Sequence, residues 1–305
     1  MRAQLETVAE ELRRLRTEGV ARVSVADETL ARLRAAVPRP SGPPGVLLAE
    51  SPSLAMETRS VSRQTRQAVS AASPGLRWDG QPIAPLPAPS EIKLPKGSKA
   101  EQMAWLCERV LSCPACNQHV RPGRKLVFGV GTPEAEIFFC GEGPGADEEQ
   151  QGEPFVGPAG QLLTKIIQAM GLSREKVYIG NVMKWRPEMP QEYGNREPTP
   201  EEVAFSLPFL RAQLEIVKPK VIVALGKTAV NGLLGPDPAR KMTKFRGQWQ
   251  TFDGVPLMPT FHPSYLLRNQ ATAIKRQVWE DMLTVMERVG MPISEKQRGF
   301  FQGKG

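Results

Sequence analysis

Residues 135–157, AEIFFCGEGPGADEEQQGEPFVG, join a short apolar run to a loop dense in glycine and proline. An apolar run that ends in glycines is typical of a buried strand feeding a turn. The loop lacks the spacing of a dinucleotide or phosphate loop, and a plain tight turn would account for its glycines. Glycines also let a ligand approach backbone amides closely, so the loop is a candidate binding element.

Further apolar runs alternate with helical patterns along the chain. Strands are expected at 176–184, 220–226 and 255–263, and helices at 158–171, 199–219 and 273–290. The helix at 199–219 opens with Thr199 and Glu202 in the pattern of a capping box. Together with the strand at 135–143, this alternation predicts an α/β fold, with a mainly parallel four-stranded sheet covered on both faces.

Composition divides the chain into unequal parts. Residues 1–36 have helical spacing and predict an N-terminal helical arm, either a docking arm or a solvated tail. Residues 37–98 are rich in Pro, Ser, Ala and Gly, which predicts a flexible, disordered linker. The globular domain is expected at 99–290, followed by a C-terminal tail at 291–305.

Charge and cysteine content bound the function. Lys and Arg number 40 against 32 Asp and Glu, a net charge of +8 that favours a polyanion partner without requiring one. The four cysteines are irregularly spaced, the N-terminus is charged throughout, and no apolar run approaches the roughly 20 residues that cross a bilayer. We expect a cytoplasmic protein with no membrane partner.

The unusual residues of the globular part follow the predicted strands. In an open parallel sheet, ligands bind beyond the carboxyl ends of the strands. Asn181, at the end of the second predicted strand, could either cap a turn or form hydrogen bonds with the edge of a nucleobase. Phe155 suits either the core or stacking on a base, and His262 suits either a structural role or a ligand contact. Their convergence predicts an active site.

The order of these motifs resembles that of the family 4 uracil-DNA glycosylases, over about Ser112 to Glu287. The collinear segments are CPAC, FGVGTPEAE, GEGPGADEE, GEPFVGPAGQLL, YIGNVMKWRP, NREPTPEE, KPKVIVALG, KFRGQW and FHPSYLLR. The resemblance implies a three-layer α/β/α sandwich that flips uracil out of DNA and hydrolyses its N-glycosidic bond, leaving an abasic site.

The resemblance also implies roles for the residues at the strand ends. Phe155 would stack on the flipped uracil, and Asn181 would read its O4 and N3–H. His262 would donate to O2 as charge develops on the leaving base. Gly141 and Gly143 would line the pocket with backbone donors.

The residue that orients the attacking water is left open. Several members of the superfamily carry an Asp at the position of Gly143. Glu142 and Glu148 are the nearby candidates for orienting the water or stabilising the cationic sugar. Because the sugar resembles an oxocarbenium ion, the water needs little activation.

The expected DNA contacts come from two basic or apolar segments. They are Lys244, Arg246, Ser264, Leu266, Leu267 and Arg268. Leu266 or Leu267 would enter the base stack as a wedge, and Arg268 would contact phosphate. For the basic residues a merely solvated surface is the alternative.

The family holds a [4Fe–4S] cluster with four cysteines, and this chain departs from that pattern. The four corresponding positions are Cys113, Cys116, Trp185 and Ser206. Since a cluster needs four suitable ligands, we expect no cofactor, with Trp185 filling the vacated volume. A site combining the remaining cysteines with Cys107 and His119 is the alternative.

The favoured function is therefore that of a DNA repair glycosylase acting on uracil in double- or single-stranded DNA. One alternative is a non-catalytic uracil- or DNA-binding homologue, and another is a glycosylase of the superfamily with altered base preference. No His occurs between 119 and 262, which argues against a variant that traps the sugar covalently. We expect a monomeric glycosylase domain, and the sequence does not identify the partner of the N-terminal arm.

Overall fold

The computed structural model describes residues 81–82, 85–187 and 195–302. All of them belong to one compact unit, residues 69–305. The expected N-terminal arm, most of the expected linker and residues 188–194 lie outside the described residues.

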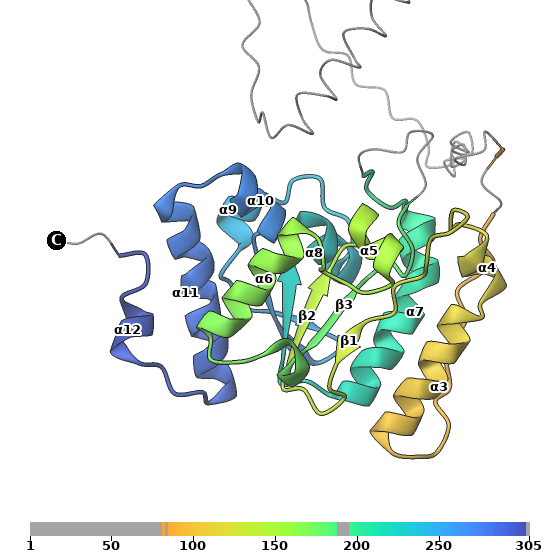
Figure 1. The fold of residues 1–305 in the computed structure, drawn as a ribbon, viewed down its shortest axis with the longest axis horizontal. Helices are drawn as coiled ribbons and strands as arrows, with labels where there is room; N and C mark the ends of the chain where they lie inside the picture. Colours follow the sequence, from red (N-terminus) through yellow and green to blue (C-terminus); the bar gives the residue numbers. More distant parts are fainter. Residues whose placement is uncertain (1–80, 83–84, 188–194, 303–305) are drawn as a thin grey trace, which may run out of the picture. The chain divides into compact units, whose positions relative to one another are not determined.

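A six-stranded sheet forms the centre of this unit, in the order β1-β3-β2-β4-β6-β5 (Figure 1). The strands are β1 (Val130–Gly131), β2 (Ile137–Gly141), β3 (Tyr178–Asn181), β4 (Val221–Leu225), β5 (Gln250–Phe252) and β6 (Val255–Thr260). The four inner strands are parallel, as predicted. The expected count of four strands was wrong because β1 and β5 add antiparallel edges, and segments this short carry no periodicity.

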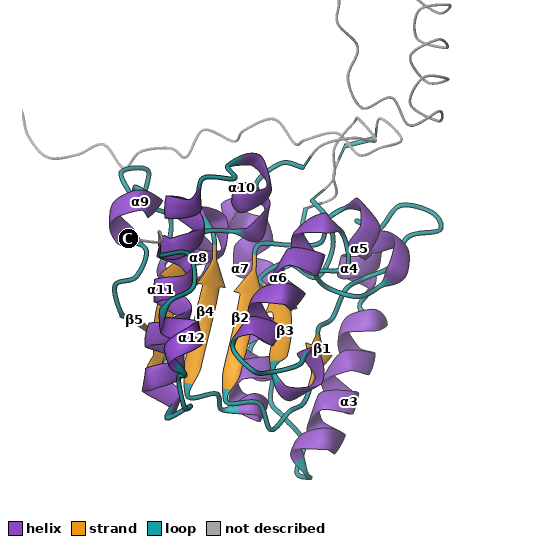
Figure 2. Cartoon of the chain, turned by 60° about the vertical axis from the view of Figure 1, so that its left-hand side comes forward, coloured by secondary structure: helices purple, strands orange, loops and turns teal. Residues whose placement is uncertain are grey.

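Helices cover both faces of the sheet, which confirms the three-layer α/β/α fold (Figure 2). The helices are α3 (Lys99–Leu111), α4 (Pro114–Asn117), α5 (Ala146–Gln151), α6 (Pro158–Ala169), η1 (Arg174–Lys176), α7 (Pro200–Val217), α8 (Lys227–Leu234), α9 (Met242–Phe245), α10 (Pro263–Arg268), α11 (Thr272–Val289) and α12 (Glu295–Arg298). Among the described ranges no helix is both long enough and apolar enough to span a membrane.

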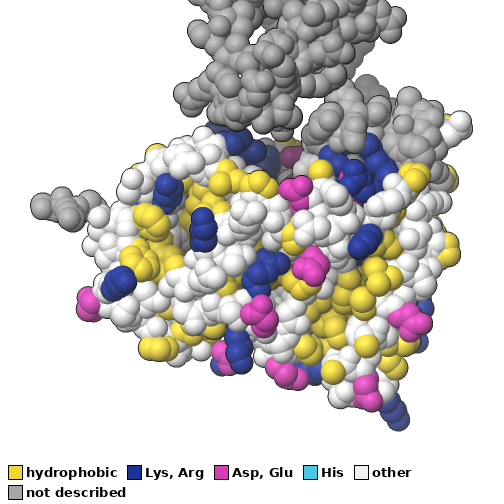
Figure 3. Space-filling view, in the orientation of Figure 1, with side chains coloured by type: hydrophobic (Ala, Val, Ile, Leu, Met, Phe, Trp, Pro, Cys, Tyr) yellow, Lys and Arg dark blue, Asp and Glu magenta, His cyan; other side chains and the backbone are white. Residues whose placement is uncertain are grey.

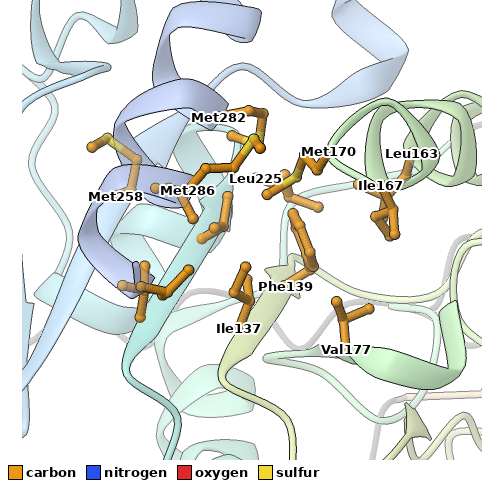
Figure 4. Packing of buried hydrophobic residues seen from close by; sticks show 14 of the residues in the cluster. Ile137, Phe139, Leu163, Ile167, Met170, Val177, Leu225, Met258, Met282 and Met286 are labelled. Carbon is orange, nitrogen blue, oxygen red and sulfur yellow. The ribbon is translucent and has the colours of Figure 1, made fainter. Parts of the chain in front are cut away.

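The alternation of side chains along β2 explains the two layers. Ile137 and Phe139 face α6 and α11, and Figure 4 shows Phe139 among Leu163, Ile167 and the methionines of this cluster. Phe138 and Cys140 point to the opposite face and pack with α7 and α8. Since successive residues of a strand face opposite sides, a continuous apolar run requires helices on both.

The described domain extends past both boundaries drawn from the sequence. Before α3, Ile92 is buried, and Leu86 and Leu94 pack against the same cluster. Beyond α11, Gln297 accepts a hydrogen bond at its backbone carbonyl from the indole N–H of Trp279, which lies within α11, at 2.6 Å. These residues outside the expected bounds of 99–290 therefore make contacts with the folded domain.

A buried ion pair ties the end of β6 to α11. Arg246 donates through Nε and Nη2 to the two oxygens of the Asp281 carboxylate, which is only 1% exposed. The hydroxyl of Thr260, the last residue of β6, donates to the same carboxylate at 2.6 Å. The expected contact of Arg246 with DNA is therefore corrected: its side chain turns inward to neutralise a buried charge.

Replacing Arg246 with Ala should lower the free energy of unfolding by about 3–5 kcal/mol, because the Asp281 carboxylate would be left buried and unpaired. Arg211 is the matched control, since it pairs with Asp253 and both side chains are about half exposed. Arg211→Ala should cost only about 0.2–1 kcal/mol. Urea unfolding of both variants measures the difference, and equal losses would contradict a structural role specific to Arg246.

Candidate active site at the carboxyl ends of the parallel strands

A cavity of about 470 Å³ opens where the four parallel strands end. The loops after β2, β3, β4 and β6 all contribute to its wall. Among its lining residues are Glu142, Phe155, Asn181, Thr228, His262 and Arg268. In Figure 3, Lys and Arg side chains gather along the upper edge of the described part, toward which the strands point in Figure 1. The structure thus brings Glu142, Phe155, Asn181, His262 and Arg268, among the predicted site residues, to one cavity.

Asn181 presents a buried amide to this cavity. It is the last residue of β3 and is only 2% exposed. Its side-chain oxygen has no hydrogen-bond partner among the described residues. A buried acceptor left in this way costs about 1–3 kcal/mol, so Asn181 Oδ1 is ready to accept a hydrogen bond from a ligand.

Gly141 allows Asn181 and Phe155 to approach each other. A Cβ at position 141 would lie 2.3 Å from Asn181 Oδ1 and 2.6 Å from the ring of Phe155. Any other residue here would force the amide and the ring apart. A Cβ at Gly143 would meet Met183 at 3.1 Å, so Gly143 also contributes by its small size.

Lys184 supports Asn181 from below, a role that no sequence pattern predicted. Its ammonium group is fully buried and donates to the backbone carbonyl of Asn181 at 2.9 Å and to Gln213 Oε1 at 2.6 Å. Burial lowers the pKa of Lys184 to about 8. The only signal was its place in NVMK, and a lysine beside an apolar run is ordinarily taken to be solvent-exposed.

His262 is held as a neutral hydrogen-bond donor. Its Nδ1 accepts from the backbone N–H of Ser264 at 3.1 Å, which assigns the proton of the neutral ring to Nε2. Burial, followed by the charge of Arg268, lowers the pKa of His262 to about 4. Its ring lies 5.7 Å from that of Phe155, centroid to centroid.

The two candidate carboxylates differ in their surroundings. Burial raises the pKa of Glu142, although a hydrogen bond with the side chain of Thr228 lowers it in part. Glu148 also lines the cavity, but its carboxylate accepts from the backbone amides of Val156 and Gly157 at 3.0 Å and of Gly145 at 3.1 Å. Glu148 therefore serves mainly to hold the loop.

The two candidate wedge residues lie next to each other in α10 but differ in their exposure. Leu266 is 5% exposed and packs with Phe261 and Val278, whereas Leu267 is 39% exposed. Ser264 and Arg268 line the cavity, and Lys244 is exposed on α9. Of the two alternatives, only Leu267 is available at the surface.

The four positions that hold a cluster in the family do not fit one here. Trp185 is buried and stacks on His119, with ring centroids 5.0 Å apart and planes 15° from parallel. The hydroxyl of Ser206 donates to the carbonyl of Val182 at 2.8 Å. Only Cys113 and Cys116 supply thiols, and within the described residues no three His, Cys, Asp or Glu are grouped to hold a metal ion. The alternative site with Cys107 and His119 is therefore not assembled there.

Comparisons with known proteins agree with this geometry. The family model for the uracil DNA glycosylase superfamily matches residues 128–283. A type-4 uracil-DNA glycosylase of Thermotoga maritima is 45% identical over 188 residues, covering 61% of this chain and 93% of the relative. One of Archaeoglobus fulgidus is 35% identical over 66% of this chain and 98% of the relative. The chain therefore belongs to the uracil-DNA glycosylase superfamily, in its type-4 family.

Proposed function

We propose that this protein excises uracil from DNA by hydrolysing the N-glycosidic bond, which leaves an abasic site. The observation that carries the proposal is the buried amide oxygen of Asn181, which accepts no hydrogen bond from any described residue, in a cavity shared with Phe155 and a neutral His262. Similarity to type-4 uracil-DNA glycosylases over nearly their whole length supports it.

Recognition follows from the donor and acceptor pattern of one amide. Asn181 Oδ1 accepts from uracil N3–H and Nδ2 donates to O4, while the ring of Phe155 stacks on the base. Cytosine presents an amine where uracil has O4, so its binding would oppose two donors. A site that leaves buried polar groups unpaired with the wrong base rejects that base strongly.

Catalysis rests on stabilising charge as the bond breaks. The Nε2–H of His262 donates to uracil O2, on which negative charge develops. A neutral donor suits this role because the neutral ring already carries a proton on Nε2, so His262 does not have to gain one from solvent first. Glu142 stabilises the cationic sugar and orients the water, since the Glu148 carboxylate is occupied by backbone amides. Glu148 is therefore assigned no part in the chemical step.

The DNA contacts place the chemistry on an extruded nucleotide. Leu267 enters the stack, Arg268 and Ser264 contact the backbone near the cavity mouth, and Lys244 contributes a further phosphate contact. Extrusion costs a few kcal/mol and least in single strands or at mismatches. A cytoplasmic location and a monomeric glycosylase domain remain predictions from the sequence.

We further propose that the protein works without a cluster. Two thiolates cannot replace the four that a [4Fe–4S] cluster requires. The aromatic stack of Trp185 and His119, with Phe205 at 6.0 Å from the indole, contributes apolar contact in place of a cross-link.

Uracil excision should be detectable with labelled oligonucleotides bearing U·G, U·A or single-stranded U, followed by alkali cleavage, and absent with cytosine or T·G. Asn181→Asp should reduce it at least about 100-fold, because a carboxylate cannot donate to O4. Asn117→Asp, at an exposed position on α4, is the matched control. Binding of uracil DNA by the wild type without any cleavage would favour the non-catalytic homologue.

The acid limb of the excision rate should report Glu142. Burial raises the pKa of this carboxyl from its ordinary value, whereas His262 stays neutral down to about pH 4. Single-turnover rates should therefore fall as Glu142 gains a proton, and in Glu142→Gln the slower reaction should keep its rate until about pH 4. His262→Gln should lose about 100- to 1000-fold and retain the Glu142 limb. A limb unchanged by Glu142→Gln would assign it to another group.

Purified protein should contain no iron and no iron–sulfur absorbance. The double variant Trp185→Cys, Ser206→Cys restores four thiols at the family's positions and should take up about four irons after anaerobic reconstitution. Cys140→Ser is the control and should leave iron uptake unchanged, because this thiol lies in the core and is not at one of the four family positions. Four irons in the wild-type protein would contradict the cluster-free proposal.

A further inference from the structure

Phe155 adopts a backbone conformation that a residue with a side chain rarely takes. Its φ is +55°, in the left-handed region. Such a conformation costs on the order of 1–2 kcal/mol for a residue other than glycine, and it persists only where the surroundings impose it. The contacts of the two peptide groups that flank Phe155 identify what imposes it.

The carbonyl side is held by Arg174, which lies in η1 after α6. Its guanidinium donates to the carbonyl of Phe155 at 3.1 Å and to the carbonyl of Pro154 at 2.8 Å. The guanidinium also donates to the hydroxyl of Thr164 in α6, at 3.3 Å, and this contact fixes the orientation of the guanidinium. A planar guanidinium can bridge two successive carbonyls in this way, whereas an ammonium group acts as a point charge.

The backbone amides of the two residues after Phe155 are held by Glu148 of α5. One carboxylate oxygen accepts from both Val156 and Gly157. Beneath the loop, Gly160 of α6 leaves room for the backbone, because a Cβ there would lie 1.9 Å from the carbonyl of Phe155. The left-handed turn is thus held by an arginine on one side, by a carboxylate on the other and by bare helix backbone below.

We infer that Arg174 is the positioning residue for the Phe155 ring, acting with Glu148 as a clamp on the backbone of residues 154–157. The ring is directed over Gly141 and toward His262, where the cavity would receive a flipped base. Arg174 lies in the segment LSREK and does not line the cavity proposed for the base. The inference rests on the proposed function only in what the ring does for excision.

Excision kinetics test whether Arg174 acts through the ring. Arg174→Met removes both carbonyl contacts and should lower kcat/KM on single-stranded uracil DNA by about 10- to 100-fold. Arg174→Lys should restore only part of the lost kcat/KM, because an ammonium group cannot bridge both carbonyls. In a Phe155→Leu background, Arg174→Met should cost less than about twofold, because the ring it positions is gone. Arg211→Met, at the exposed pair with Asp253, should leave the rate unchanged.

Hydrogen exchange provides a readout that needs no activity. In Arg174→Met the amides of residues 155–157 should exchange faster than in the wild type, while those of β4 stay as they are. Equal rate losses in the wild-type and Phe155→Leu backgrounds, or unchanged exchange at 155–157, would overturn the inference. If the wild type cleaves no uracil substrate, the proposed function falls, and the exchange experiment still decides whether Arg174 clamps the loop.

Discussion

The approach of Asn181 and Phe155 over Gly141 is the constraint on which the rest of the site depends. Parallel pairing sets Gly141 of β2 directly beside Asn181 of β3, and the missing side chain at 141 lets the amide and the ring share one small volume. Such close packing tolerates no methyl group. The register of two central strands thus becomes the geometry of a recognition pocket.

Polar groups that are wholly or partly buried hold this geometry through hydrogen bonds. Lys184 fixes the carbonyl of Asn181, Arg174 fixes that of Phe155, and Asp281 fixes Thr260, two residues before His262. Lys184 and Asp281 are buried, and a buried charge without a partner is expensive, so these two groups stay in place only while their partners do. The pocket is therefore organised before any ligand arrives, and rigidity of this kind is what electrostatic stabilisation of a transition state requires.

In the cluster-free protein that we propose, packing takes the place of the metal cluster of the family. Trp185 fills the space among Cys116, Met183 and Phe205, in the segment that leads directly away from Asn181. A cluster ties distant segments together by covalent ligation, and a large aromatic side chain does so by burying area against them. The position of Lys184, immediately before Trp185, links that packing to the pocket.

Local pattern in the sequence by itself determined the four parallel strands, the helices between them, and Phe155, Asn181 and His262 as the residues at the strand ends. These depend on the periodicity and on motifs within a few residues, which the chain carries wherever it folds. Only the tertiary structure decided the role of Arg246, whose partner Asp281 lies 35 residues away, the choice between Leu266 and Leu267, and the roles of Glu148 and Arg174. Burial and hydrogen-bond partners arise from segments that meet only after folding, so no local pattern could reveal them.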